Sequence, residues 1–254
     1  MSPPQQFDIC NSFGGFGVVC QAGYIMATST ESASRVAKAV PIFSWSSPTR
    51  WSSKPKPVAI LIAGLTLFGF GDWLLIASRF GNSPWSVLAG GIDKHTNIGI
   101  GTVTVITSAV VLLLWIPLRQ RPGLGTVANA IIIGSVVEIL DRNVGSIDSF
   151  VGRCAMLAGG LVSVGIGGAL YLSTQLGPGP RDGLMTSIGT RFHRPIAHVR
   201  LAIEVTVLTL GWALGGRLGV GTFIFAFAIG HLLAFFVGLL HRLDHGGAPS
   251  TIAV

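Results

Sequence analysis

Charged side chains are scarce in this sequence of 254 residues: Asp, Glu, Lys and Arg make up 11% of it, against about 25% in soluble domains. Hydrophobic residues make up 50%, and the mean hydropathy is +0.66. So few charges cannot keep so much apolar surface in water. The composition therefore excludes an ordinary soluble domain and predicts an integral membrane protein.

Cysteine is equally sparse, and familiar catalytic motifs are absent. The three cysteines (Cys10, Cys20 and Cys154) show no metal-binding spacing and imply no disulfide framework. The sequence has no phosphate-binding P-loop, no HExxH zinc motif and no GxSxG nucleophile motif. We therefore expect no catalytic residue, no cofactor and no metal, and a transporter driven by ATP would need a partner chain.

Basic residues outnumber acidic ones by 17 to 10, which gives a formal net charge of +7. Such an excess indicates nucleic-acid binding when it forms a patch with interleaved aromatic side chains. Here the basic residues are spread between apolar runs, so nucleic acid is not an expected partner. Membrane lipid is.

Six windows approach the length of about 20 apolar residues that crosses the hydrocarbon core. They are 58–78, 99–117, 123–140, 154–173, 196–214 and 221–240. Two shorter segments, 84–95 and 180–192, have helical character but are too short and too polar to cross. With six spans, 12 of the 17 Lys and Arg residues lie on the side that holds both chain ends. Because Lys and Arg favour cytoplasmic loops, we expect both termini in the cytoplasm.

The two ends of the chain are predicted to lie outside the membrane. Residues 1–57 show no sustained apolar period and include the polar stretch WSSPTRWSSKPKP. We predict a disordered N-terminal segment or linker there, and Met26 is an alternative start of translation. Residues 241–254 are predicted to form a cytoplasmic tail.

The apolar part of the sequence repeats itself at an interval of 96 residues. Between 64 and 134, 22 of 71 positions are identical to the residue 96 positions later, and glycines and a proline are among them. We predict an all-α membrane fold of two repeats, 58–140 and 154–240, each with three spans and a short half-helix after the first. Because three is odd, the second repeat would be inverted in the membrane, as in many secondary transporters. Duplication is also a way to build a passive bundle.

The half-helices begin in related turns, GNSPWS and GPGPRD. In the first, Ser83 is a suitable N-cap, Pro84 suits the first helical position, and Ser86 follows. Free amides and the helix dipole make such N-termini binding sites for anions. We therefore place these three residues in a candidate substrate-binding site.

The second half-helix carries charge where the first does not. Pro180 occupies the position equivalent to Pro84, and Arg181 and Asp182 follow it. An arginine can bind a carboxylate or phosphate with two parallel hydrogen bonds, so these three residues join the candidate site. The alternative is a surface turn before an interfacial helix, with Arg181 on lipid phosphate and Asp182 as a helix cap.

Ionisable residues within spans are costly and often functional. Glu204 lies near the middle of the fifth window, and Arg200 precedes it by one helical turn, so the two can form an ion pair. The pair is either structural or part of the substrate site. Asp72 and Asn129 are weaker candidates.

The segments GNSPW, RPGLGTVAN, GPGPRDGLM, VRLAIEVTVLTLGW and GVGTFIFAFAIG resemble the bacterial YczE-type integral membrane proteins, a group close to YitT. The resemblance covers residues 58 to 240. It implies a multi-pass protein of the bacterial inner membrane without an assigned molecular function, and it supplies no catalytic residue.

From these patterns we predict a secondary permease for a small polar or anionic metabolite, and not an enzyme. The alternative is a membrane scaffold or regulatory protein that does not transport. A homo-oligomer is compatible with both.

Overall fold

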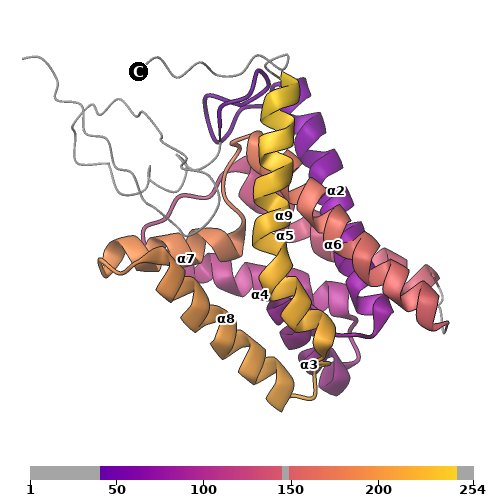
Figure 1. Cartoon of the computed structure of the whole chain (residues 1–254). Coiled ribbons are helices and arrows are strands. Elements are labelled where there is room, and N and C mark those ends of the chain that lie inside the picture. The colour runs from indigo at the N-terminus through magenta and orange to yellow at the C-terminus, as the bar shows by residue number, and fades with distance from the viewer. Residues whose placement is uncertain (1–40, 145–148, 245–254) are drawn as a thin grey trace, which may run out of the picture.

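The computed structural model describes residues 41–144 and 149–244 of the chain (Figure 1). Within those ranges it is all-helical, as predicted from the sequence. The helices are α2 (Pro55–Ser78), α3 (Pro84–Thr96), α4 (Ile100–Trp115), α5 (Leu124–Asn143), α6 (Phe150–Ser173), α7 (Pro180–Arg191), α8 (Ile196–Ala213) and α9 (Val220–Asp244).

Several of these helices can cross a membrane. By length and hydropathy α2, α5, α6 and α9 qualify, and α3 with α4 form a further candidate as a pair bent by 114° at a short break. Helix α4 alone has 16 residues, or about 24 Å, which is less than the hydrocarbon thickness of about 30 Å. The structure supports four or five spans, so the number six stays a prediction.

The segment before α2 packs onto the end of α6. Phe43 is buried, the Trp45 indole donates a hydrogen bond of 2.9 Å to Ser173 Oγ, and the Ser47 amide donates one of 2.9 Å to the Thr174 carbonyl. The Ser47 amide thereby satisfies a carbonyl that the end of α6 leaves free. The predicted disorder of residues 1–57 is therefore wrong for residues 41–57.

The other predicted boundary changes at the C-terminus. Helix α9 continues to Asp244, whose carboxylate accepts hydrogen bonds from the amide and hydroxyl of Ser44. Residues 241–244 are thus helix and not tail. Residues 1–40, with the alternative start at Met26, and residues 245–254 lie outside the described part of the chain.

Two pairs of glycines bring α2 and α6 into close contact, and these helices run side by side in Figure 1. A Cβ on Gly64 would lie 3.0 Å from the Gly167 carbonyl oxygen, and one on Gly71 would lie 2.8 Å from the Gly160 carbonyl oxygen. Such contacts are typical of membrane helices that pack through small residues. The contacts are crossed with respect to the interval of 96 residues. Gly167 stands 96 residues after Gly71 but contacts Gly64, and Gly160 stands 96 residues after Gly64 but contacts Gly71.

Other backbone features recur at the same interval. The Gly221 amide donates to the Phe80 carbonyl at 2.8 Å, and the Gly125 amide donates to the Leu176 carbonyl at 3.0 Å. A positive φ occurs in four pairs of positions 96 residues apart: Arg79 and Gln175, Gly81 and Gly177, Asn97 and His193, Arg119 and Gly215. Since most of these pairs are unlike residues, the interval recurs in the backbone and not only in the sequence.

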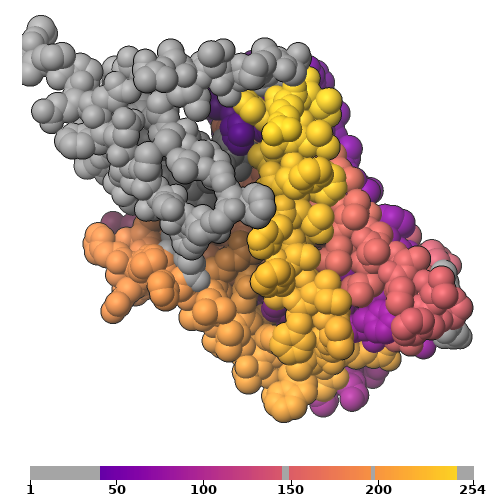
Figure 2. Space-filling view, in the orientation of Figure 1, coloured from indigo at the N-terminus to yellow at the C-terminus, as the bar shows by residue number. Residues whose placement is uncertain are grey.

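The remaining helices form two environments. Helices α3, α4, α7 and α8 pack around a core that contains Trp85, Trp115 and Leu184. Helix α9 instead packs mainly on α6, with 6% of its most apolar window buried. It lies along the front of the molecule in Figure 2 and exposes Phe223 and Phe227. This surface fits contact with lipid.

Candidate functional site

The two half-helices predicted from the sequence are α3 and α7, and they begin at Pro84 and Pro180. Ser83 caps α3, because its Oγ accepts a hydrogen bond of 3.3 Å from the Ser86 amide. Helix α7 follows Gly179 and has no side-chain cap. The amides of its first turn are therefore left for other acceptors. Asp182 does not supply the predicted cap.

The N-terminal turns of these half-helices meet. The Arg181 guanidinium lies over the Trp85 ring, 4.9 Å from its centroid, in the geometry of a cation–π interaction. Trp85 and Arg181 stand 96 residues apart in the sequence. The second residue of α3 therefore contacts the second residue of α7.

A buried carboxylate lies beside this contact. The Ser86 hydroxyl is 3.0 Å from both carboxylate oxygens of Asp72 in α2 and donates its hydrogen there. Ser83 Oγ is 2.8 Å from Ser86 Oγ, so the Ser83 hydroxyl acts as the donor of that bond. Asp72 is 4% exposed and interacts electrostatically with Arg181. The cation of α7 thus faces an anion from α2.

The second carboxylate, Asp182, is exposed. It interacts electrostatically with Arg181 and, in α8, with Arg200 and Glu204. The Arg200 Nε donates to Glu204 Oε1 at 2.9 Å, so the ion pair predicted from their spacing is present. Asp182 therefore lies near enough to the charged residues of α7 and α8 to interact with them electrostatically.

Two further polar side chains face the start of α7. A Cβ on Gly179 would lie 3.3 Å from the Tyr171 hydroxyl, 3.3 Å from Asp182 Oδ2 and 3.4 Å from Asn129 Nδ2. The Tyr171 hydroxyl is buried and has no hydrogen-bond partner among the described residues. The glycine keeps open a small space between α5, α6 and α7. Sequence analysis ranked Asn129 low and missed Tyr171, because an aromatic residue in an apolar helix carries no signal of function.

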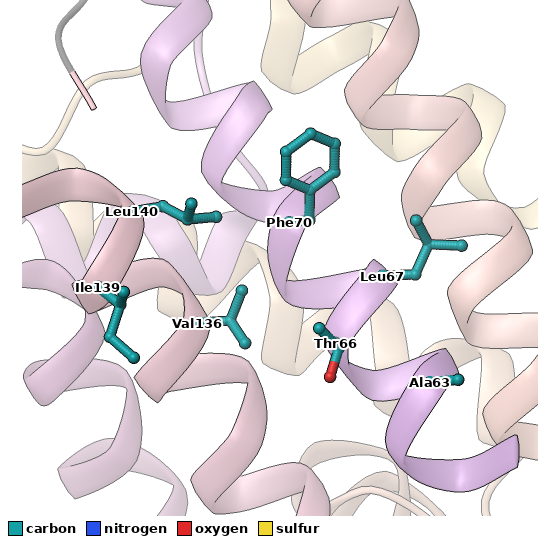
Figure 3. A pocket seen from close by; sticks show the side chains of 7 residues that line it. All are labelled: Ala63, Thr66, Leu67, Phe70, Val136, Ile139 and Leu140. Carbon is teal, nitrogen blue, oxygen red and sulfur yellow. The ribbon is translucent and has the colours of Figure 1, made fainter. Parts of the chain in front are cut away.

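The groove in Figure 3 lies away from this site, between α2 and α5. Its volume is about 530 Å³, and it is lined by Ala63, Thr66, Leu67, Phe70, Val136, Ile139 and Leu140. None of these side chains is charged. Thr66 is the one polar residue of this lining, so the groove suits an apolar occupant better than a polar solute.

Comparisons with known proteins place the chain among bacterial membrane proteins. Residues 55–238 match the family described as "Family of unknown function (DUF6198)". An uncharacterised protein of Haemophilus influenzae is 39% identical over 208 residues, which are 82% of this chain and 95% of that protein. The uncharacterised membrane protein YczE of Bacillus subtilis is 30% identical over 195 residues, 76% of this chain and 91% of YczE.

A second protein of Bacillus subtilis, the uncharacterised YyaS, is 28% identical over 183 residues, 70% of this chain and 91% of YyaS. No solved structure matches the chain. The relatives support the resemblance found in the sequence and assign no activity.

Proposed function

This chain belongs to the family of unknown function DUF6198 and is an integral membrane protein of the YczE type, and we propose that it is a secondary permease for a small polar or anionic metabolite. The observation that carries the proposal is the meeting of two half-helix N-termini at Trp85 and Arg181.

The contacts between counterparts fit a two-fold axis. Gly64 packs on Gly167 and Gly71 on Gly160, so each glycine contacts the counterpart of the other. Reciprocal contacts of this kind are the mark of two-fold symmetry. A residue that contacts its own counterpart, as Arg181 does, lies on the axis.

Three spans in each repeat would put this axis in the membrane plane. We infer six spans as two inverted repeats, with both termini in the cytoplasm of a bacterium and the chain in its inner membrane. Transporters built this way bind substrate near the midplane at the interface of the repeats, where broken helices present their N-termini. The uncapped start of α7 and the Arg181 guanidinium would then supply donors to a polar or anionic ligand.

The two halves differ at one interface, which also supports transport. A Cβ on Gly134 in α5 would lie 2.7 Å from the Gly101 carbonyl oxygen in α4. The counterpart Gly230 in α9 has no atom of the described residues within 4 Å of that position. In a second conformation α8 would pack against α9 and α4 would separate from α5. The central site would then open to the other side of the membrane. A scaffold has no need of such a difference.

The test compares metabolites in three strains: a deletion strain, the same strain carrying the parent gene, and the same strain carrying Arg181→Gln. We expect a polar or anionic metabolite to change on deletion and to return to its normal level with the parent gene only. Proteoliposomes should then carry that metabolite faster than protein-free liposomes. Equal flux in the two would refute the permease and favour the scaffold.

A further inference from the structure

We propose that the ligand of this site is a small zwitterion, bound with its anionic group at Arg181 and its cationic group at Asp182. The proposal rests on the proposed function for the place of the site and adds the chemical class of the ligand. It follows from unused donors, an unused acceptor and the sum of charges.

The unused donors belong to Arg181. A guanidinium has five N–H donors and accepts nothing. Arg181 contacts the Trp85 ring, and it makes no hydrogen bond within the described residues. The nearby Asp72 accepts from Ser86, and no hydrogen bond joins it to Arg181 among the described residues. The planar fork of Arg181 is therefore left for a group with two acceptor oxygens, which a carboxylate provides.

The unused acceptor is the exposed carboxylate of Asp182. Among the described residues it accepts no hydrogen bond, and the ion pair beside it is already formed between Arg200 and Glu204. Its Oδ2 borders the small space at Gly179, together with Asn129 and the unpartnered hydroxyl of Tyr171. An ammonium group beside Asp182 can donate to the carboxylate and to the tyrosine oxygen at once.

The net charge of the site favours a zwitterion over a simple anion as the ligand. Arg200 balances Glu204, and Arg181 is shared between Asp72 and Asp182, which leaves a net charge of about −1 when all are ionised. A bound anion would change the net charge of the site from about −1 to about −2 inside the membrane, where unpaired charge is costly. A zwitterion leaves the net charge unchanged and pairs both free groups.

Neighbouring positions on one helix turn carry the two charges, so the ligand should be short. Suitable probes are glycine, β-alanine and γ-aminobutyrate. For each there is a carboxylate of the same carbon number (acetate, propionate, butyrate) and an amine (methylamine, ethylamine, propylamine). The assay is thermal stabilisation of the purified full chain in detergent as a function of probe concentration.

We expect at least one amino acid to stabilise the protein at a concentration tenfold or more below that needed for its matched carboxylate and amine. Arg181→Gln and Asp182→Asn should each weaken this binding roughly tenfold or more, since each removes a charged hydrogen bond. Arg121→Gln and Asp141→Asn make the same chemical changes at exposed positions away from the site, and should bind within about twofold of the parent.

A second variant covers the case in which Arg181→Gln does not fold. Gly179 has a φ of −59°, so Gly179→Ala keeps the backbone and every charge but fills the space beside Tyr171. It should weaken binding of the amino acid about tenfold. The matched control is Gly159→Ala, whose Cβ would meet its nearest atom at 3.7 Å and should have no effect.

Three results would overturn the zwitterion: a carboxylate that binds as well as its amino acid, an amine that does so, or no stabilisation by any of the three amino acids. The permease is judged separately, by flux in proteoliposomes. Tight binding of an amino acid without flux refutes transport and leaves the ligand class standing, whereas flux of carboxylates alone refutes the ligand class and leaves transport standing.

Discussion

The close crossing of α2 and α6 allows a stability prediction that depends on the interval of 96 residues. In Gly71→Ala the new Cβ would lie 2.7 Å from the Val164 amide nitrogen and 2.8 Å from the Gly160 carbonyl oxygen. Ordinary contact needs about 3.4 Å or more, so the helices must separate by roughly 0.7 Å. Backbone atoms cannot turn aside as a flexible side chain can, and overpacking of this kind costs about 1–3 kcal/mol.

The matched change in the other repeat is Gly167→Ala, where the Cβ would lie 2.5 Å from the Phe68 amide nitrogen and 2.6 Å from the Gly64 carbonyl oxygen. Two-fold packing predicts a similar loss of stability for both variants. Gly159→Ala, on α6 but with its Cβ in an ordinary contact of 3.7 Å with Leu74, is the control and should be within about 0.5 kcal/mol of the parent.

The assay is unfolding of the purified protein in a titration with sodium dodecyl sulfate, followed by circular dichroism. Each of the two variants should unfold at a lower detergent fraction than the parent and the control. If Gly71→Ala and Gly167→Ala unfold at the same detergent fraction as the parent, the helices do not cross at these glycines. A two-fold axis through Trp85 and Arg181 is then not supported.

Three further predictions concern topology, the N-terminal segment and the second conformation. Cysteines introduced at Lys94 and Arg191 should label from opposite sides of the membrane, the first from outside and the second from the cytoplasm; labelling from one side would overturn the inversion. A chain that begins at Ser52 should melt below the full chain, because it loses the contacts that the preceding segment makes with the end of α6, and equal melting would show that these contacts contribute nothing. With the native cysteines replaced by serine, Leu201→Cys and Gly230→Cys should cross-link in the membrane if α8 closes on α9; no cross-link over long oxidation would refute the exchange of arrangements between the halves.

Local rules accounted for much of this architecture. Pro84 and Pro180 begin α3 and α7 because a proline at the first helical position loses no hydrogen bond. Ser83 caps its helix, and Arg200 pairs with Glu204 because residues four apart share a helix face. Each of these features depends on residues that are close in the sequence.

The features that could not be predicted depend on contacts between distant segments. Asp72 is an isolated acid in an apolar run, and its role becomes visible only when α7 brings Arg181 beside it. Phe43 and Trp45 belong to a segment with no helical period, and their order comes from the end of α6. The sequence separated the short segment 84–95 from the window 99–117, but the bend of 114° between α3 and α4 depends on how both pack against other helices.

If the chain arose by duplication, as we propose, symmetry explains why unlike residues meet at the central contact. A duplicated chain first places two identical side chains at a contact on its axis, and two arginines there would repel each other in a medium of low dielectric. Trp85 against Arg181 removes that conflict, because the ring attracts the guanidinium instead. Tyr171 stands 96 residues after Leu75, and this difference places a hydroxyl beside Gly179. An asymmetric ligand with two unlike groups suits such a site better than a symmetric one.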